Sequence, residues 1–468
     1  MKLAQVAFAV CFGLTVVVAT GAAPPQQPGV RGKDAPSAIV PEPADAPAAP
    51  PGQGPFVAEG RNPDGPLSLA DVERMAERSN PSLAQAAARV EAARGRYVQV
   101  GLYPNPVAGY IGAEIGNEGR AGQQGAFVSQ ELVTAGKLGL NRAVVSQEIE
   151  QANWAYQSQR LRVLTDVRRT FYEVLVAQQT VDLTQQLVRI GEQGVRSTEE
   201  LMKAKEVARN DVLQAKIEAD SAKVLLERAR NRYLSAWRNL AAVMGACDMP
   251  PTPLAGNVQD GMAPLAWEET LRRLWANSPQ LASARVGVAR AQAMLGRECA
   301  GRVPNLGVQT SVQYDNATRD TFASIQVGAP IPIFNRNQGN IRRAQAELLA
   351  AQHDVKRTEL ELQQRLAAAF EQYTNARYQA EKYSKDILPN AQASLKLTTA
   401  GYQQGEFSYL SLLTAQRTFF QTNLTYLDAL RELRAATATI EGNLLGDSLR
   451  PVEAVEQGGR SDLDARGP

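Results

Sequence analysis

The sequence holds few of the side chains on which metal centres and catalytic sites depend. It has one histidine, His353, and three cysteines among 468 residues, and none of them stands at the spacing of zinc ligands. Cys247 and Cys299 lie in different halves of the chain, so no pairing between them is indicated. A glycine-rich phosphate loop and a nucleophile with its base are also missing. We therefore expect no metal centre, no cofactor and no enzymatic activity.

The sequence also lacks a surplus of charge of either sign. Lysine and arginine number 50, and aspartate and glutamate number 48, so the formal net charge is only +2 at pH 7. Charges of both signs are spread along the chain, whereas nucleic-acid binders usually gather basic residues into patches. We expect no nucleic-acid partner.

A long apolar run occurs only near the N-terminus. Lys2 precedes apolar residues 6–19, small residues follow at 20–23, and proline comes directly after them. The run is short for a membrane helix, so a cleaved signal peptide over residues 1–23 is expected. Because Val10 is not small, we interpret Cys11 as part of this segment rather than as a lipoprotein cysteine.

Two segments have almost none of the large apolar residues that a folded core requires. Residues 24–66 are rich in proline, alanine and glycine, and residues 450–468 are mostly polar. Such segments bury too little apolar surface to offset the entropy of ordering them. We expect a disordered leader and a disordered tail.

What the sequence does contain is a heptad pattern that occurs twice. Small and apolar residues recur every three or four positions through the first copy, and a similar set, from Leu412 to Ile440, follows about 200 residues later. The pattern predicts a duplication built of long coiled-coil helices: repeat 1 over residues 67–249, a linker over 250–263 and repeat 2 over 264–449. The first copy consists of Val212, Ala215, Ala219, Ala222, Leu226, Ala229, Tyr233, Ala236, Leu240 and Val243.

Both repeats contain a helix that leads into a β-hairpin. Asn80-Pro81 and Ser278-Pro279 are helix-start signals, and a Pro-Asn pair stops the helix near residues 100 and 300. The pattern then changes to period two, with strands of about ten residues on either side of polar or glycine-rich turns. Ten residues is the length that a tilted membrane-spanning strand needs, although an ordinary surface hairpin would look similar.

The alternation predicts two unlike faces on these hairpins. We expect one face to meet lipid and the other to meet a water-filled lumen. The expected lipid-facing residues are Val107, Ile111, Val308, Val312, Tyr314, Ile325 and Val327, and the expected lumen-facing residues are Gln309, Gln313 and Gln326. Four strands cannot close a membrane barrel, because the smallest single-chain barrels have about eight, and open edges are not tolerated in lipid. Several chains are therefore expected to share one barrel.

Beyond each hairpin the helical pattern becomes very long. Residues 338–385 contain no proline and would reach about 70 Å as one helix. Such a length exceeds what a globular core needs, so we expect the helices to form a wall or tube. Each repeat then turns sharply, at residues 205–208 and 405–408, before its last helix.

These features together resemble the TolC family of outer-membrane efflux channels. The resemblance covers residues 67–449 and rests on the duplication, the Pro-Asn exits, the Pro330-Ile331-Pro332-Ile333-Phe334 segment and the Asp211-Val212-Leu213-Gln214-Ala215 element. It implies a mainly α fold with a small β part: coiled-coil helices forming an α-helical barrel, plus two β-hairpins contributed to a shared trimeric transmembrane β-barrel. It also implies a passive conduit in the outer membrane with a long periplasmic extension, and as partners outer-membrane lipid, a periplasmic adaptor and an inner-membrane pump.

One part of the resemblance bears on the exported solute. The run Ser129-Gln130-Glu131-Leu132 followed by Gly136-Lys137 and Asn141-Arg142 is similar to a run in the cobalt–zinc–cadmium export subgroup of that family. Metal cations or drug-like compounds are the expected cargo. A wide water-filled pore needs no tight ligands, so the scarcity of histidine does not oppose a metal cargo.

The resemblance also marks the residues of the periplasmic tip. Family members often close this tip with rings of acidic residues, and Ser411 and Thr414 occupy the matching positions here. Closure by charge, by packing and by hydrogen bonds all remain open alternatives. The tip residues implied in gating are Lys205, Glu206, Asp211, Gly405, Glu406, Ser411 and Thr414.

Another class of protein shares part of this pattern. A periplasmic coiled-coil structural or adaptor protein would have the long helices without a transmembrane barrel. The alternating hairpins favour the channel.

Overall fold

The computed structural model describes residues 65–119, 121–260 and 263–450. The predicted signal peptide, nearly all of the predicted leader and all but the first residue of the predicted tail lie outside these ranges. The division into repeats at residues 67–249 and 264–449 remains a proposal.

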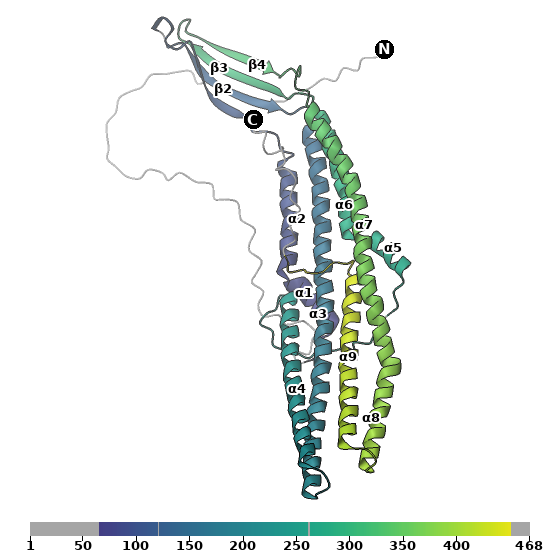
Figure 1. Cartoon of the computed structure of the whole chain (residues 1–468). Helices are drawn as coiled ribbons and strands as arrows, with labels where there is room; N and C mark the ends of the chain where they lie inside the picture. Colours follow the sequence, from purple (N-terminus) through teal and green to yellow (C-terminus); the bar gives the residue numbers. More distant parts are fainter. Residues whose placement is uncertain (1–64, 120, 261–262, 451–468) are drawn as a thin grey trace, which may run out of the picture. The chain divides into compact units, whose positions relative to one another are not determined.

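The described chain is mainly helical, with two β-hairpins, as the sequence predicts (Figure 1). Two successions of elements follow the same order: two helices, a hairpin and a pair of long helical segments. The first contains α1 (Leu69–Ser79), α2 (Pro81–Gln99), β1 (Val107–Ala113), a 3₁₀ turn (Asn117–Gly119), β2 (Gln123–Leu132), α3 (Lys137–Lys203) and α4 (Arg209–Met244). The second contains α5 (Trp267–Asn277), α6 (Pro279–Ala300), β3 (Leu306–Asp315), β4 (Asp320–Gly328), α7 (Gln338–Lys382), a π-helical segment η2 (Tyr383–Ile387), α8 (Leu388–Gln403) and α9 (Tyr409–Glu441).

The predicted helix starts are confirmed by their caps. The Asn80 side-chain oxygen accepts a hydrogen bond from the Ser82 backbone N–H at 2.9 Å, and Ser278 accepts one from the Leu281 N–H at 3.4 Å. These bonds satisfy amide protons that have no partner within the first helical turn. The Asn80 side chain also donates to the Val243 carbonyl at 2.7 Å, which ties the start of α2 to the end of α4.

The long helical segments differ between the two halves. α3 is continuous over 67 residues, about 100 Å at 1.5 Å per residue. Its counterpart is divided into α7 with 45 residues, η2 with 5 and α8 with 16. Pro389 explains the division, because proline has no N–H and would clash with the carbonyl four residues earlier. The wider π turn, in which the Leu388 N–H bonds to the Tyr383 carbonyl, lets the helix continue past this proline.

The α4 heptad pattern forms a close helix–helix seam. Val212, Ala215, Ala219 and Leu240 are all buried, each with at most 5% of its surface exposed. An added Cβ at Gly191 of α3 would come within 3.1 Å of the Ala219 Cα. The small residues therefore let the backbones of α3 and α4 approach closely, as the pattern predicts.

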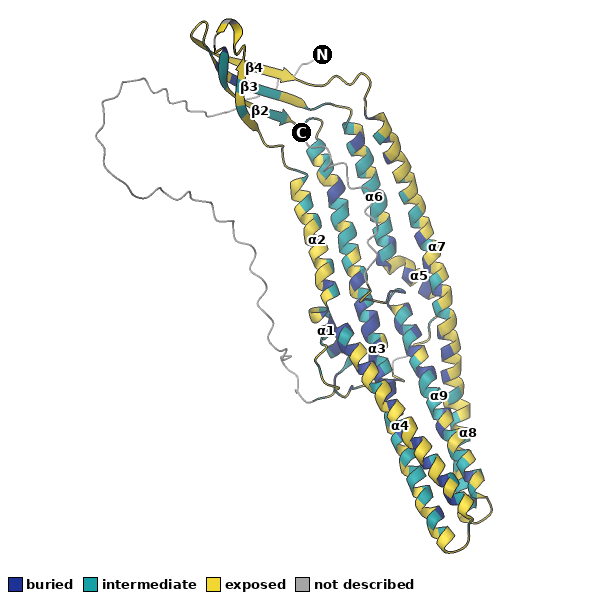
Figure 2. Ribbon diagram, turned by 60° about the vertical axis from the view of Figure 1, so that its left-hand side comes forward, coloured by how far each residue is buried: buried dark blue, intermediate teal, exposed yellow. Residues whose placement is uncertain are grey.

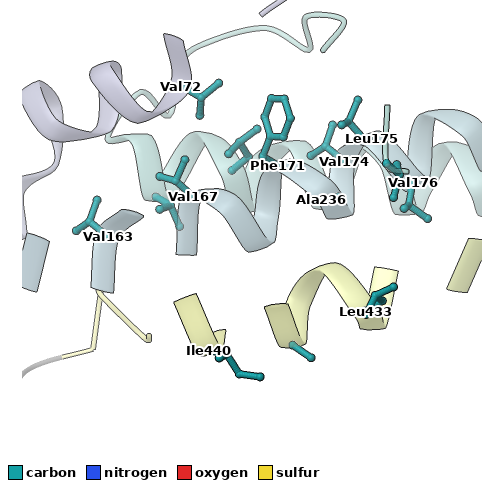
Figure 3. Close-up of a cluster of buried hydrophobic side chains, with 14 of the residues drawn as sticks. Val72, Val163, Val167, Phe171, Val174, Leu175, Val176, Ala236, Leu433 and Ile440 are labelled. Carbon is teal, nitrogen blue, oxygen red and sulfur yellow. The ribbon is translucent and has the colours of Figure 1, made fainter. Parts of the chain in front are cut away.

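The main core lies where α1, α3, α4, α7 and α9 pack together midway along the helices. Figure 3 shows side chains of α3, among them Phe171 and Val174, facing residues of α1, α4 and α9. Arg434 of α9 binds the segment between α4 and α5, which joins the two halves, to this core. Its guanidinium donates to the Val258 carbonyl at 2.6 Å and lies 4.4 Å from the centre of the Tyr172 ring. Burial lowers the pKa of Arg434.

The four strands form one antiparallel sheet in the order β1-β2-β3-β4. The central β2–β3 pair joins the two hairpins, with Ser129 opposite Gln309. β1 and β4 are the edge strands. α2, α3, α6 and α7 each begin or end beside the sheet, and neighbours in that order pack against each other.

Within the residues described, no helix is both long enough and apolar enough to cross a membrane.

Candidate functional site

One face of the sheet is apolar and exposed. Residues paired across antiparallel strands point to the same face, and the pairs Val308–Val327 and Thr310–Ile325 place the valines and the isoleucine together. Val312 and Tyr314 follow at alternate positions of β3 and share this face. Five large side chains on it expose between 53% and 74% of their surface: Tyr110, Val128, Val312, Ile325 and Val327. An exposed apolar surface of this kind marks an interaction site for lipid or protein.

The opposite face is polar around its middle. Gln309 and Gln326 are directly paired. The Ser311 hydroxyl lies 2.7 Å from the Ser324 hydroxyl, and the Gln313 amide donates to Ser311 at 3.0 Å. Ser311 and Gln313 are only 3% and 7% exposed, so these hydrogen bonds satisfy polar groups that are withdrawn from solvent. Gln309, Gln313 and Gln326 therefore share one face of the sheet. That this face lines a water-filled lumen stays a prediction.

For β1 the predicted face is wrong. Val107 lies opposite Ser129, which in turn lies opposite Gln309, so Val107 is on the polar face. Ile111 follows four positions later and is on the same face. β1 contributes Tyr110 to the apolar face instead. The phase of β1 was ambiguous in the sequence, because glycine and alanine occupy positions on both of its faces.

The two turns at the far ends of the long helices have the same structure. Lys205 and Gly405 occupy equivalent positions with left-handed φ values of +64° and +77°. The next residue in each turn donates its N–H back to the helix, Glu206 to the Leu201 carbonyl at 2.9 Å and Glu406 to the Gly401 carbonyl at 2.8 Å. The left-handed position suits glycine and costs energy for lysine. The predicted tip residues of the two halves therefore belong to matching turns.

The remaining predicted tip residues lie in the first turns of the helices that follow these turns. The Asp211 carboxylate accepts a hydrogen bond from the Ala208 N–H at 3.1 Å at the start of α4. In α9 the Ser411 hydroxyl lies 3.0 Å from the Ser408 hydroxyl, and Thr414 donates to the Leu410 carbonyl at 2.9 Å. These contacts keep each side chain close to its own helix.

The structure adds four residues to the tip that sequence reasoning missed. Tyr402 and Tyr409 flank the second turn, with ring centroids 6.0 Å apart. Burial raises the pKa of Tyr409 to about 12, and Tyr402, Glu218 and Asp211 contribute to the shift. An ion pair between Glu218 of α4 and Arg417 of α9 joins the two helical hairpins.

The Tyr402 hydroxyl is buried and has no hydrogen-bond partner among the described side chains and backbone groups. Burial and the nearby Asp211 charge both raise the pKa of Tyr402. The only sequence signal for this tyrosine pair was its position on either side of Gly405. The first half has no matching pair, because Met202 and Arg209 stand at the equivalent positions.

In the ranges that the structure describes, no three histidine, cysteine, aspartate or glutamate side chains gather where they could hold a metal ion. His353 lies exposed on α7.

Comparison with known proteins gives consistent matches. The family profile described as outer membrane efflux protein matches residues 73–246 and 270–446. The cobalt-zinc-cadmium resistance protein CzcC of Cupriavidus metallidurans is 29% identical over 381 residues, which cover 81% of this chain and 90% of CzcC.

Solved structures agree in fold at lower identity. A crystal structure of CusC aligns with a TM-score of 0.67 and 19% identity, covering 81% of this chain and 92% of that one. The outer membrane protein VceC of Vibrio cholerae aligns with a TM-score of 0.65 and 17% identity, covering 81% of this chain and 96% of that one. At these identities the likeness establishes the fold.

Proposed function

The chain belongs to the outer membrane efflux protein family, and from this membership we propose that it is the exit duct of a system that exports divalent metal cations. The protein is an outer-membrane efflux channel with a periplasmic helical extension, and channels of its family work as trimers in tripartite systems. It is not an enzyme. This family assignment confirms the predicted resemblance and argues against a periplasmic scaffold without a membrane part.

The metal cargo rests on CzcC, whose name describes cobalt, zinc and cadmium resistance and whose alignment spans most of both chains. A channel of this kind does not need to bind its cargo tightly, because conduction requires that an ion leave as readily as it enters. The cargo is therefore set largely by the pump that delivers it. We place a periplasmic adaptor and an inner-membrane pump upstream of the channel.

In the proposed assembly the sheet lies in the outer membrane. Three chains of four strands would give a barrel of 3 × 4 = 12 strands, enough to close and leave no open edge in lipid. The face of Val308, Val312 and Ile325 would meet lipid, and the face of Gln309 and Gln326 would meet water. The exposure of the apolar face supports this orientation, because lipid would replace the water that now covers it.

We assign gating to the tip turns at the far ends of the helices. With Ser411 and Thr414 in place of acids, closure would rest on packing of the Tyr402–Tyr409 pair and on the Glu218–Arg417 ion pair. Asp211 would hold the start of α4 in place. The π-helical segment η2 gives the α7–α9 pair of helical segments a point at which it can bend. The continuous helix α3 has no such point.

Exchange of the channel in Cupriavidus metallidurans tests the cargo. A strain without CzcC would carry this chain, and growth would be measured over a range of cobalt, zinc and cadmium concentrations. Restored growth in all three metals, together with lower cell-associated metal, is the expected result. A chain with a deleted tip turn, confirmed to reach the outer membrane, is the matched control.

Two outcomes would contradict the metal assignment. One is full outer-membrane assembly with no gain in metal tolerance while the adaptor and pump are present and bound. The other is a gain in tolerance to drug-like compounds alone, which would point to the other predicted cargo.

A further inference from the structure

One pair of neighbouring strands in the sheet has no turn to connect it. β1 and β2 form one hairpin and β3 and β4 form the other, and the turn of a hairpin helps to fix its register. β2 and β3 come from different halves of the chain: Leu132 and Leu306 are paired although they lie 306 − 132 = 174 positions apart. Figure 2 shows this β2–β3 seam in the middle of the sheet, with more buried residues on β3 than on β4. Other contacts must therefore fix its register.

The alternation of apolar and polar residues excludes only some of the wrong registers. A slip of one residue would bring the polar residues of β3 to the apolar face of β2. A slip of two residues would leave every side chain on its own face, because the side chains of a strand repeat with period two. It would shift β3 by about 7 Å along β2. Contacts made by single positions are needed to exclude such a slip.

The side chain of Asn305, directly before β3, binds the first half of the chain through both of its polar atoms. Its Nδ2 donates to a Glu131 carboxylate oxygen at 2.6 Å. Its Oδ1 accepts hydrogen bonds from the Lys137 ammonium at 2.6 Å and from the Thr134 backbone N–H at 3.3 Å. Glu131, Thr134 and Lys137 together form the Asn305 receptor. Two of the three bonds involve a charged group, and hydrogen bonds of that kind are the stronger ones.

Two members of the receptor also bind the connector that leads into β3. The Lys137 ammonium donates to the Val303 carbonyl at 2.6 Å, and the Thr134 hydroxyl donates to the Pro304 carbonyl at 2.7 Å. Burial lowers the pKa of Lys137. Withdrawing an ammonium group from water costs free energy unless its donors find other partners, and here the connector supplies them. The receptor therefore binds three successive residues, 303–305.

A close approach of the two backbones in the seam favours the same register. Gly125 of β2 lies opposite Gln313 of β3. A Cβ added at Gly125 would overlap the Val312 carbonyl oxygen and come within 2.6 Å of the Gln313 Cα. After a slip of two residues, Gln123 or Phe127 would stand opposite Gln313 instead. Of these three residues only Gly125 lacks a side chain, so the close approach fits the observed register.

A second asparagine holds the far end of the seam but cannot choose the register. Asn316, directly after β3, donates its backbone N–H at 3.1 Å and its side-chain amide at 2.6 Å to the Gly122 carbonyl. A backbone carbonyl is present at every residue, so a slipped strand could offer another one. The choice of register therefore rests on the Asn305 receptor and on Gly125.

We propose that Glu131, Thr134 and Lys137 are positioning residues, which set the register of the β2–β3 seam by binding Asn305. The run from Ser129 to Arg142, which resembles the cobalt–zinc–cadmium subgroup, thereby gains a role in aligning the two hairpins into one sheet. This role does not depend on which solute the channel carries.

Disulfide mapping in the full chain, assembled in the outer membrane, tests this role. Ser129→Cys with Gln309→Cys joins two residues that are opposite in the observed register, and opposite Cα atoms lie within disulfide range. Ser129→Cys with Ser311→Cys reports a slip of two residues. Both pairs are placed in a background with Cys247→Ser and Cys299→Ser, and free thiols are counted on gels with a maleimide mass tag. With the receptor intact, only the first pair should cross-link.

Loss of the receptor contacts should allow slipped strands to form. Asn305→Ala should lower the ratio of in-register to slipped cross-link by about tenfold, because a hydrogen bond to a charged group contributes at least roughly that factor to an equilibrium. Lys137→Met should lower the ratio too, and the double variant should add little to Asn305→Ala, since the two residues share one network. Asn340→Ala is the matched control. This asparagine donates to Asn337 of its own half, so its loss should leave the ratio unchanged.

A rescue experiment covers the case in which Asn305→Ala does not assemble. The disulfide between Ser129→Cys and Gln309→Cys fixes the same register covalently. It should therefore restore assembly of the Asn305→Ala chain, whereas Ser129→Cys alone should not.

Three outcomes would overturn the proposal. The first is an Asn305→Ala chain that assembles with an unchanged ratio of the two cross-links. The second is an equal fall of that ratio in Asn340→Ala, which would make the effect a general loss of stability. The third is an Asn305→Ala chain that does not assemble and that the in-register disulfide does not restore.

Discussion

The unlike faces of β4 allow a sharp test of how the sheet meets the membrane. Ile325 and Gln326 are neighbours in the middle of the strand, so they lie at nearly the same depth but point to opposite faces. Ile325 is 74% exposed in the single chain. If its face meets lipid, Ile325→Arg places a charge in hydrocarbon, whereas Gln326→Arg places it in water.

The expected magnitudes follow from this difference. An arginine on the lipid face near the midplane costs about 2–4 kcal/mol, a factor of roughly 30 to 1,000 in the folding equilibrium. The same residue on the lumen face should cost much less. Ile325→Val is the control for the loss of packing alone.

Denaturant titration of folding into lipid vesicles would measure the two free energies of unfolding. The register adds an internal check, because Val107 lies on the face of Gln309. Val107→Arg should therefore resemble Gln326→Arg. Equal destabilisation by Ile325→Arg and Gln326→Arg would refute the orientation, and so would a larger effect of the lumen-face variant.

Three further predictions concern the tip. Glu218→Gln should weaken the ion pair with Arg417 and raise single-channel conductance in planar bilayers, and Arg417→Gln should do the same; unchanged conductance in both would exclude this pair from closure. The pKa of Tyr409 is raised from 10.0 to about 12. The neutral side chain's contribution to the stability of the closed tip is therefore complete below pH 10 and declines as the pH rises toward 12. Conductance should increase over that interval, and Tyr409→Phe should remove this increase. Trivalent cations should block the natural channel weakly, and Ser411→Asp with Thr414→Asp should create strong block, because a ring of acids focuses the field at a narrow entrance; strong block of the unsubstituted channel would contradict the charge-poor entrance.

Local signals were enough to predict most of the secondary structure. The caps at Asn80 and Ser278 and the change to period two after each Pro-Asn pair depend on neighbouring residues only. The α4 seam could also be predicted from the sequence, because its heptad spacing is maintained over four heptads. In β3 and β4 a clear alternation of apolar and polar residues placed Val308 and Gln309 on opposite faces.

Other features depend on contacts that sequence spacing does not reveal. The face of Val107 is set by the register between β1 and β2, and no residue of β1 alone fixes that register. The π turn at Tyr383–Ile387 allows the helix to continue past Pro389. Helix propensity alone would predict that the helix ends before this proline. The Glu218–Arg417 pair joins residues 417 − 218 = 199 positions apart, and only the packing of α4 near α9 brings them together.

Native mass spectrometry of the protein extracted from outer membranes in mild detergent tests the central claim most directly. A shared barrel requires that no single chain remain folded with its β1 and β4 edges open. The predicted result is a complex of three mature chains that persists as detergent is diluted and dissociates only on unfolding. A stable, folded monomer that retains the sheet would contradict the account.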